Sequence, residues 1–319
     1  MDNLLEIKNL FVEYVSDKNA FGGKQIIHAV NGVSLNVKKG EILAIAGESG
    51  CGKSTLARAI LRLENSKSGE IDFEGKNILK FNSAELKKYR QNAQMIFQNP
   101  YASLNPKMKV SEILKEPLQI NTKFSNKEID KIIDEKLEQV GLSNEVLKLY
   151  PHEFSGGQRQ RIAIARALVL SPKFIVADEP VSALDVSIQA QIINLLKELK
   201  DNFNLTLILI THDMSVIKYL ADRVAVMYLG EIVEVGRCDE IFTAPKHPYT
   251  QALLSAVPQL VEDEKDRIVL SGELPSPSNL PVGCKFHTRC RKCFERCSVD
   301  VPPYVKLSDT HFVKCFLYK

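Results

Sequence analysis

The sequence lacks any apolar run long enough to cross a lipid bilayer. Its longest apolar stretches, such as residues 205–210, are far shorter than the roughly 18 to 20 residues that a membrane helix needs. The segment Met1–Glu6 has no basic region followed by an apolar run, so we expect no secretory signal and a cytoplasmic location. The sequence also has little excess of charge of either sign, because the net charge is only +3 over 319 residues. The lack of a membrane-spanning run predicts that any membrane contact is made through partner proteins. The small net charge gives no indication of nucleic-acid binding.

Cysteine is scarce until the end of the chain. Five of the seven cysteines lie between Cys284 and Cys315, whereas Cys51 and Cys238 stand alone. In a reducing compartment such a cluster indicates metal binding more than disulfide bonds. The rest of the composition is ordinary for a soluble globular protein, with 45% hydrophobic and 25% charged residues. The length suffices for one large domain with a small appendage or for two modest domains.

The hydrophobic pattern alternates between strand-like and helix-like segments. Short apolar runs bounded by turn residues predict strands, and apolar residues at helical spacing predict amphipathic helices. The expected strands cover residues 5–15, 30–45, 174–177 and 205–210, and the expected helices cover residues 56–63, 125–140 and 188–199. Turns are expected at Asn31-Gly32 and at residues 38–40, and a loop at residues 16–24. The pattern predicts a mostly parallel α/β core with a separate helical subdomain.

A phosphate-binding motif follows the apolar residues 42–46. The segment from Gly47 to Ser54 matches G-x-x-x-x-G-K-[ST] between a predicted strand and a predicted helix, which argues against a chance glycine-rich turn. The expected nucleotide-binding residues are Gly47, Glu48, Ser49, Gly50, Cys51, Gly52, Lys53, Ser54 and Thr55. Backbone N–H groups would hold phosphate oxygens, Lys53 would meet the β- and γ-phosphates, and Ser54 would bind Mg²⁺. We expect Cys51 to be a small filler that is sensitive to alkylation rather than a nucleophile.

Two acidic residues follow the predicted strand at residues 174–177. Asp178 and Glu179 would lie at the carboxyl end of a buried strand, where α/β proteins bind ligands. Asp178 suits a Mg²⁺ ion held through water, and Glu179 suits a base that accepts a proton from the attacking water. The alternative is a pair of solvated acids, which the complete phosphate motif disfavours.

A third motif narrows the class of protein. Phe154-Ser155-Gly156-Gly157-Gln158 precedes a basic, helix-forming run, and this segment resembles the signature of ABC ATPases, which usually have Leu in place of Phe154. The resemblance implies a P-loop ABC cassette with a RecA-like α/β core, an antiparallel β subdomain and a helical subdomain. It also implies that two cassettes sandwich ATP. The serine and glycines of one signature then contact nucleotide on the partner's P-loop through a hydroxyl and close backbone approach.

The remaining motifs of that family occur in order along the chain. Gln98 resembles the Q-loop glutamine, residues 182–185 resemble the D-loop at the dimer interface, and His212 resembles the switch histidine. An aromatic residue upstream of the P-loop is expected to stack on adenine, with Tyr14 as the candidate and Phe21 as the alternative. The resemblance implies ATP and Mg²⁺ as cofactors. It implies the catalytic residues Glu179, His212 and Gln98 and the Mg²⁺ ligands Ser54, Gln98 and Asp178.

Further segments resemble the oligopeptide and dipeptide importer branch of this family. These segments are residues 98–106, 150–154, 247–254 and 283–290. The loop at residues 16–24 is similar to that of the second ATPase subunit in such importers. The resemblance implies a second ABC ATPase subunit in a homo- or heterodimer, two transmembrane permease subunits and an extracytoplasmic peptide-binding protein as partners, without nucleic acid. It implies a peripheral location at the cytoplasmic face of the cell membrane.

Four cysteines of the tail match those of the same branch. The set is Cys284, Cys290, Cys297 and Cys315. They resemble the ligands of a four-iron four-sulfur cluster, although Zn²⁺ accepts the same thiolates and His287 or His311 can replace one of them. Unligated buried cysteines are a further alternative, and Cys293 is an addition to the branch's pattern.

The sequence therefore predicts two domains and one function. Residues 1–258 are expected to form an ABC nucleotide-binding domain, and the Pro- and Cys-rich residues 259–319 a C-terminal extension. The predicted function is ATP hydrolysis that energises import of oligopeptides or dipeptides across the cytoplasmic membrane, with nickel or another small solute as an alternative cargo. A DNA-repair or chromosome ABC ATPase would insert a long coiled coil between P-loop and signature, and a ribosome-acting one would typically carry two cassettes. This sequence has one P-loop, one signature and no such insertion.

Overall fold

Two groups of chain segments fold as separate units in the computed structural model, which describes residues 3–16, 25–256, 268–270 and 272–318. The first unit comprises Met1–Lys38, Ile42–Leu79 and Ile210–Lys319, and the second comprises Lys39–Glu41 and Lys80–Leu209. The loop predicted at residues 16–24, which includes Phe21, lies almost wholly outside the described residues. The predicted domain boundary at residue 258 also falls outside them. That boundary stays a prediction.

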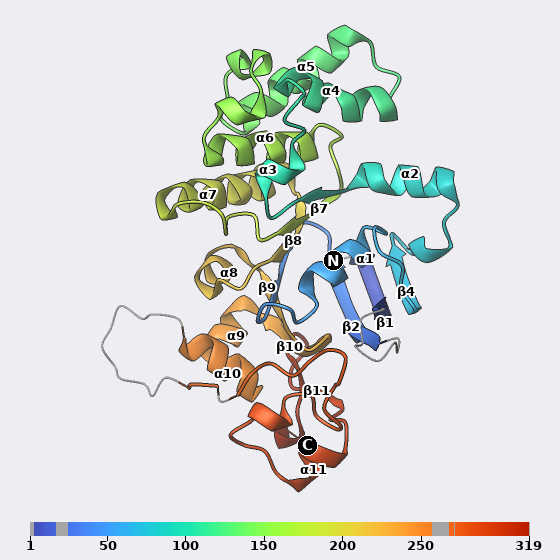
Figure 1. The fold of residues 1–319 in the computed structure, drawn as a ribbon, viewed down its shortest axis with the longest axis vertical. Helices are drawn as coiled ribbons and strands as arrows, with labels where there is room; N and C mark the ends of the chain where they lie inside the picture. Colours follow the sequence, from blue (N-terminus) through green and yellow to red (C-terminus); the bar gives the residue numbers. More distant parts are fainter. Residues whose placement is uncertain (1–2, 17–24, 257–267, 271, 319) are drawn as a thin grey trace. The chain divides into compact units, whose positions relative to one another are not determined.

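The first unit contains both ends of the chain (Figure 1). Its strands are β1 (Asn3–Ser16), β2 (Gln25–Lys38), β3 (Ile42–Ala46), β4 (Ser68–Phe73), β5 (Lys76–Asn77), β9 (Arg223–Tyr228), β10 (Glu231–Arg237), β11 (Tyr304–Lys306) and β12 (Phe312–Lys314). Its helices are α1 (Lys53–Ile60), α8 (Met214–Leu220), α9 (Cys238–Thr243), α10 (Pro248–Ser255) and α11 (Glu295–Val299). Short 3₁₀ helices are η1 (Ile78–Lys80), η4 (His287–Arg289) and η5 (Phe316–Tyr318).

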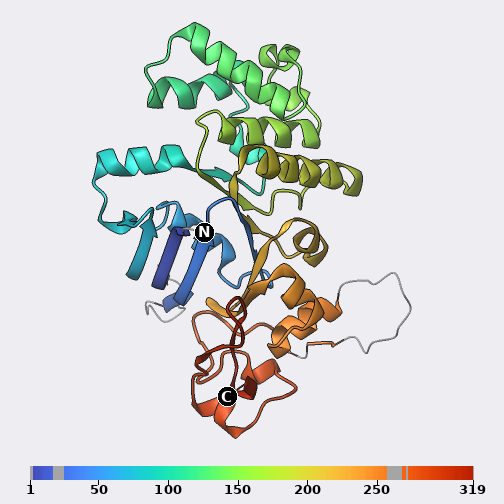
Figure 2. The ribbon, with the colours of Figure 1, turned by 180° about the vertical axis from the view of Figure 1, so that it is seen from behind.

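An antiparallel sheet in this unit has the strand order β2-β1-β4-β5. Figures 1 and 2 show β1, β2 and β4 side by side from opposite directions. The turn expected at Asn31-Gly32 is wrong, because β2 continues through both residues. Gly32 takes a φ of 65° there, and the register against β1 shifts near Leu10 and Phe11, so the glycine permits an irregularity rather than a reversal. The turn expected at residues 38–40 is confirmed at Lys39 and Gly40.

A second sheet in the first unit has the order β11-β12-β10-β9-β3. Strand β3 pairs in parallel with β9, whereas β9, β10, β12 and β11 pair antiparallel in turn. All five residues of β3 are buried, as a continuous apolar run predicts. The helix expected to reach residue 63 ends earlier, at Ile60, because Arg62 takes a left-handed φ of 54°.

Aromatic side chains join the tail to the core of the first unit. The ring of Tyr228, at the end of β9, lies 4.7 Å from that of Tyr249 in α10 and 5.2 Å from that of Phe286 (centroid distances). Phe286 is only 2% exposed, although it lies within the Pro- and Cys-rich part of the sequence. The C-terminal segment therefore contributes to the same hydrophobic core as β3 and β9.

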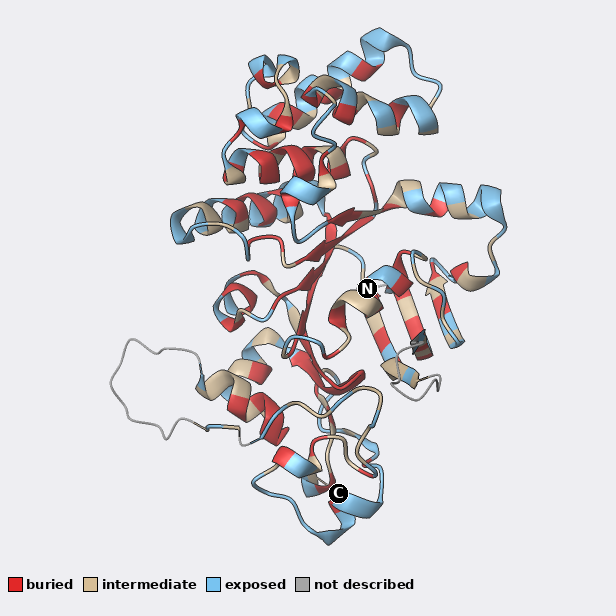
Figure 3. Ribbon diagram, viewed as in Figure 1, coloured by how far each residue is buried: buried red, intermediate tan, exposed pale blue. Residues whose placement is uncertain are grey.

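The second unit is mostly helical. Its helices are α2 (Ser83–Asn92), α3 (Pro100–Ser103), α4 (Val110–Asn121), α5 (Asn126–Gln139), α6 (Gly156–Leu168) and α7 (Val186–Phe203), with the 3₁₀ helices η2 (Asn144–Lys148) and η3 (Pro151–Glu153). Its strands are β6 (Ala93–Ile96), β7 (Phe174–Asp178) and β8 (Thr206–Ile210), in the order β8-β7-β6. Strands β6 and β7 pair in parallel. Figure 3 shows β7 and β8 buried along their length, whereas the helices of this unit alternate buried and exposed residues.

Several predicted elements of the second unit are confirmed. Helix α5 begins after Ser125 with the expected capping box to Glu128 and buries Ile129, Ile133 and Leu137 on one face. Helix α7 and strands β7 and β8 match their predicted segments to within a few residues. Within the described ranges, none of the helices is both long and apolar enough to span a membrane.

Candidate nucleotide-binding site

The predicted phosphate loop lies between β3 and α1 in the first unit. A Cβ atom added at Gly47 would lie 2.2 Å from the carbonyl oxygen of Met227, and one added at Gly52 would lie 2.1 Å from that of Ala29. Gly52 also has a φ of 105°, which L side chains rarely adopt. Only glycine fits these two places, so the loop keeps the close backbone path that presents N–H groups to an anion.

Lys53 points back into this loop. Its Nζ atom donates to the carbonyl oxygens of Gly47 at 2.7 Å and Glu48 at 2.8 Å, and the side chain is 5% exposed. Lys53 is the first residue of α1, and Ser54 and Thr55 follow it in the first turn. The N-cap, Gly52, brings no capping side chain. The helix N-terminus, the lysine and two hydroxyls therefore surround one small region that suits a polyphosphate.

Cys51 does not fit the expectation of an alkylation-sensitive thiol. The residue is 1% exposed, and burial raises the pKa of its thiol, although Lys53 opposes that shift. A buried protonated thiol reacts slowly with alkylating reagents. Its position does agree with the expected role of a small space-filling residue, because Sγ of Cys51 packs against Gly47.

Two of the predicted catalytic residues meet in the second unit. Strand β7 ends at Asp178, which is 4% exposed, and the next residue, Glu179, has a left-handed φ of 45°. The amide Nε2 of Gln98 donates to Oε2 of Glu179 at 2.7 Å, across 81 positions of sequence. A non-glycine residue held at positive φ is strained, and such strain is common where a side chain must be aimed at a reacting group.

The signature segment forms the start of α6. Ser155 is the N-cap, its Oγ accepts from the N–H of Gln158, and the Gln158 side chain accepts from the Ser155 N–H in return. A Cβ at Gly157 would lie 2.5 Å from Cγ2 of Ile188, and one at Gly156 would lie 3.2 Å from Cδ2 of Leu184. The glycines thus allow the segment that includes residues 182–185 to pack directly on the signature helix.

The other predicted residues are placed as follows. His212 comes after β8 and is exposed, in the unit that holds the phosphate loop. Tyr14 lies in β1 opposite Ile27 and is half-buried. Its alternative, Phe21, lies outside the described residues.

The thiols of Cys290, Cys297 and Cys315 lie close enough to Cys284 to act on its pKa. Burial raises the pKa of the Cys284 thiol to about 12, and the thiols of Cys297, Cys315 and Cys290 add to the shift. Even so, the described ranges hold no group of three or more His, Cys, Asp or Glu side chains arranged to bind a metal ion. His311 is committed elsewhere, because its Nε2 lies 2.7 Å from a carboxylate oxygen of the buried Glu234.

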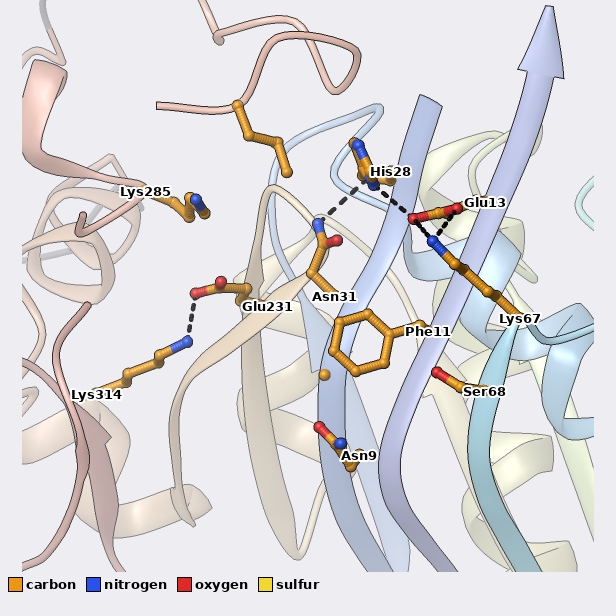
Figure 4. Close-up of a pocket in the computed structure, with 12 residues that line it drawn as sticks. Asn9, Phe11, Glu13, His28, Asn31, Lys67, Ser68, Glu231, Lys285 and Lys314 are labelled. Atoms are coloured by element: carbon orange, nitrogen blue, oxygen red, sulfur yellow. Dashed lines mark hydrogen bonds and ion pairs between the residues drawn. The ribbon is translucent and has the colours of Figure 1, made fainter. Parts of the chain in front are cut away.

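The first unit has a cavity of about 620 Å³ that is lined by residues outside the predicted nucleotide site (Figure 4). Its lining comprises Asn9, Phe11, Glu13, His28, Asn31, Gly32, Lys67, Ser68, Glu231, Leu280, Lys285 and Lys314. None of these belongs to the predicted nucleotide site. Lys67 pairs with Glu13 at 2.7 Å and Lys314 with Glu231 at 2.6 Å, so much of its charge is neutralised by the lining itself.

One contact of the phosphate loop had no signal in the sequence. The guanidinium of Arg289, in the tail, forms a two-pronged ion pair with the carboxylate of Glu48. The two residues are 241 positions apart, and Arg289 lies in no motif that we singled out for nucleotide binding.

The phosphate loop, the strand-end acids and the capped signature helix together define an ABC-type ATPase cassette. A family model described as ABC transporter matches residues 30–182, and one described as oligopeptide/dipeptide transporter, C-terminal region, matches residues 233–297. The chain belongs to the family of oligopeptide and dipeptide transport ATP-binding proteins. The predicted fold class is confirmed.

Relatives share this organisation along nearly the whole chain. The oligopeptide transport ATP-binding protein AppF of Bacillus subtilis (strain 168) is 51% identical over 92% of this chain and 90% of its own length. The dipeptide transport ATP-binding protein DppF of Escherichia coli (strain K12) is 49% identical, covering 98% of this chain and 94% of its own. Among solved structures, the dimeric ATP-binding cassette MJ0796, in a post-hydrolysis state bound to ADP and Pi, is 32% identical with a TM-score of 0.65. That match covers 73% of this chain and 98% of that chain.

Proposed function

We propose that this chain is the ATP-hydrolysing subunit of an importer for oligopeptides or dipeptides. The observation that carries the proposal is the near full-length identity to dipeptide and oligopeptide transport ATP-binding proteins, which extends through the C-terminal region of that family. The ATPase part has independent support, because the phosphate loop has the shape and charge for a triphosphate.

Each predicted site residue has a role in this proposal. The N–H groups of residues 47–55 and the ammonium of Lys53 bind the triphosphate. Ser54 and Asp178, with Gln98, are the residues that would hold Mg²⁺, whose chemistry when bound is to neutralise charge on the phosphates. Glu179 accepts a proton from the attacking water. Gln98 keeps the Glu179 carboxylate oriented through their 2.7 Å hydrogen bond.

Two copies of the cassette complete the proposed reaction. The dimeric cassette at TM-score 0.65 supports an arrangement in which two cassettes act together. Residues 155–158 of one subunit would contact nucleotide on the partner's P-loop, and His212 would contact the γ-phosphate. The partner is a second ABC ATPase subunit, and this chain is of the second-ATPase type. Tyr14 would stack on adenine.

The remaining partners lie in and across the membrane. We propose two permease subunits, contacted through the Gln98 region, and an extracytoplasmic binding protein that delivers peptide. This places the chain at the cytoplasmic face of the membrane, with membrane contact through the permeases alone. Permeases and binding protein would select the cargo, so this chain would not touch the peptide.

Uptake by reconstituted vesicles tests the function. Proteoliposomes containing the complex should accumulate a labelled oligopeptide in the presence of MgATP and the binding protein. The same complex with Lys53→Ala in this chain should bind nucleotide weakly and lose most uptake, because the phosphate charge loses its buried partner. Unchanged MgATP affinity in the Lys53→Ala chain would contradict the proposed phosphate site, and uptake without ATP would contradict the motor role.

We further propose that the four tail cysteines hold a four-iron four-sulfur cluster, with Zn²⁺ as the alternative. Their donor chemistry fits either group. Burial raises the pKa of three of the thiols, and a backbone N–H group two residues further along the chain opposes each shift. The pairs are Phe286 with Cys284, Lys292 with Cys290 and Leu317 with Cys315. The side chains would still have to close around the group.

Analysis of the anaerobically purified chain for iron, acid-labile sulfide and zinc distinguishes these two cases. Cys297→Ser should reduce whichever group is bound, whereas Cys238→Ser, away from the set, should not. A chain that carries none of the three elements would contradict the proposal.

A further inference from the structure

The tail reaches the phosphate loop through one buried arginine. Nη1 of Arg289 donates to Oε2 of Glu48 at 2.6 Å, and Nη2 donates to Oε1 at 3.0 Å. The Arg289 side chain is 7% exposed and the Glu48 side chain 29% exposed. Two parallel hydrogen bonds from a guanidinium to a carboxylate fix both distance and orientation. The pair therefore specifies where the Glu48 side chain points.

The backbone of Glu48 is held at both ends as well. Its N–H donates to the hydroxyl of Tyr249 in α10 at 2.8 Å, and its carbonyl oxygen accepts from Nζ of Lys53 at 2.8 Å. A continuous chain of hydrogen bonds thus runs from Arg289 and Tyr249 through Glu48 to Lys53. A shift of Glu48 would move the carbonyl that positions the lysine.

Buried aromatic side chains hold the backbone near Arg289 in place. Phe286, three residues earlier, packs its ring 5.2 Å from that of Tyr228 and 5.4 Å from that of Tyr249 (centroid distances). Tyr228, Tyr249 and Phe286 are all 2% exposed or less. Buried aromatic contacts of this kind leave little freedom, so the guanidinium is presented to the loop from a fixed place.

The charge of Glu48 explains why the loop needs this partner. A carboxylate within a phosphate-binding loop repels a polyanion, and repulsion is stronger where water is partly excluded. Arg289 neutralises that carboxylate from the side of the tail. Without it the loop would carry an uncompensated negative charge on the residue whose carbonyl oxygen accepts from Lys53.

We propose that Arg289 is a positioning residue for the nucleotide site, through which the C-terminal extension sets the affinity of the phosphate loop for ATP. Arg289 acts through Glu48 and Lys53. This inference rests on the proposed function, because it assumes that residues 47–55 bind the triphosphate.

A double-mutant cycle on the full-length chain tests this role. The variants are Arg289→Gln, Glu48→Gln and the two together, titrated by calorimetry with the Mg²⁺ complex of a non-hydrolysable ATP analogue. Arg289→Gln should raise Kd about tenfold, because Glu48 is left charged and unpaired. The double variant should recover most of the lost affinity, because the repelling carboxylate is also gone. The loss in Arg289→Gln should shrink as salt concentration rises.

Controls separate positioning from general damage. Arg291→Gln is the matched control, since Arg291 is exposed and its guanidinium donates to the carbonyl of Val269 instead. It should bind like the wild type, and thermal melting should show that all variants are folded. If Arg289→Gln binds normally, or if the double variant is as weak as Arg289→Gln, the inference is overturned.

Failure of the proposed function gives a different result. In that case the wild-type chain would not bind the analogue, or Lys53→Ala would bind it as well as the wild type does. Normal wild-type binding, weak Lys53→Ala binding and no effect of Arg289→Gln would overturn only the role of Arg289.

Discussion

Glu179 joins a strained backbone to a short side-chain hydrogen bond. Its φ of 45° and its 2.7 Å bond from Gln98 aim the carboxylate in one direction, as a base requires. We predict that Glu179→Gln keeps nucleotide affinity within about threefold of the wild type but lowers hydrolysis by at least about 100-fold, because the amide cannot accept the proton. Phosphate release by the assembled complex and a binding titration measure the two effects separately.

The matched control for this prediction is Glu198→Gln, an identical change at an exposed position of α7. It should leave phosphate release unaltered. Normal turnover in the Glu179→Gln complex would refute the role assigned to Glu179.

His247 gives the fold a dependence on pH. It is 1% exposed, and burial lowers its pKa from 6.5 to about 4, although Glu234 opposes the shift and Lys314 adds to it. Between these two values the unfolded chain binds the proton and the folded chain does not. Stability therefore rises with pH across this window, and up to about 3 kcal/mol is lost as the pH falls through it.

Replacement of His247 tests this window. We predict that His247→Asn flattens the rise in unfolding free energy between about pH 4 and 6.5, because Asn does not titrate. The Asn oxygen can still cap α10, as Nδ1 of His247 does by accepting from the Tyr249 N–H. His152→Asn, at an exposed site, should keep the wild-type slope of unfolding free energy against pH. Urea denaturation at a series of pH values measures this slope. An unchanged slope in His247→Asn would assign the pH dependence to other groups.

The candidate site residues come from contiguous motifs of the sequence and their roles stay predictions, whereas contacts between distant residues are what the sequence missed. The phosphate loop and the strand-end acids are contiguous motifs, so their chemistry is visible in order along the chain. The hydrogen bond between Gln98 and Glu179 was not predicted, because their sequence motifs give each residue a role and no contact between the two. The contact of Arg289 with Glu48 was missed, because no local pattern records which arginine of the tail becomes buried against the loop.

At the scale of elements, the signature helix depends on two glycines. Gly157 lets α6 approach α7 so closely that an added Cβ would lie 2.5 Å from Cγ2 of Ile188. We predict that Gly157→Ala costs about 1 to 3 kcal/mol of stability in denaturant unfolding, because the crowded methyl forces the helices apart. Adding Ile188→Ala should recover part of the loss by removing the opposing methyl. Gly75→Ala is unsuitable as a control, because Gly75 has a φ of 77° and an alanine there would be strained. The control is therefore Ala84→Gly, which exchanges the same two residue types at an exposed helix position away from this contact.

If Gly157→Ala melts like the wild type, the close packing of α6 on α7 is not required for stability. If Ile188→Ala worsens the variant instead, the contact is not the source of the strain. Both outcomes would contradict the account of why this glycine occupies the signature.

Elements with their own local signals were predicted well, and those that depend on pairing were not. Helix α5 has a capping box and an apolar face, and β7 and β8 are short apolar runs, so each was found from sequence. The continuation of β2 through Asn31-Gly32 depends on β1 as its partner, and the pattern N-G alone indicates a turn. The early end of α1 depends on the left-handed Arg62, which helical spacing does not reveal.

At the scale of the whole molecule, the tail belongs to the unit that holds the phosphate loop. Phe286 shares a hydrophobic core with β3 and β9, and Arg289 contacts the loop itself. Composition alone indicated an appendage, because the proline and cysteine content changes there. Composition does not show which side chains of the tail are buried. The family of peptide transport ATP-binding proteins carries this tail as a recognised region, and its contact with the loop suggests a reason for its presence.

The measurement that tests the central claim most directly is ATP hydrolysis by the complex of this chain with its partner ATPase, permeases and binding protein, purified without oxygen. We predict that peptide-loaded binding protein stimulates hydrolysis several-fold over the unloaded protein, and that Lys53→Ala in this chain removes the stimulation. Robust hydrolysis that is indifferent to every binding protein and every peptide would contradict the account and indicate an ATPase that does not drive import.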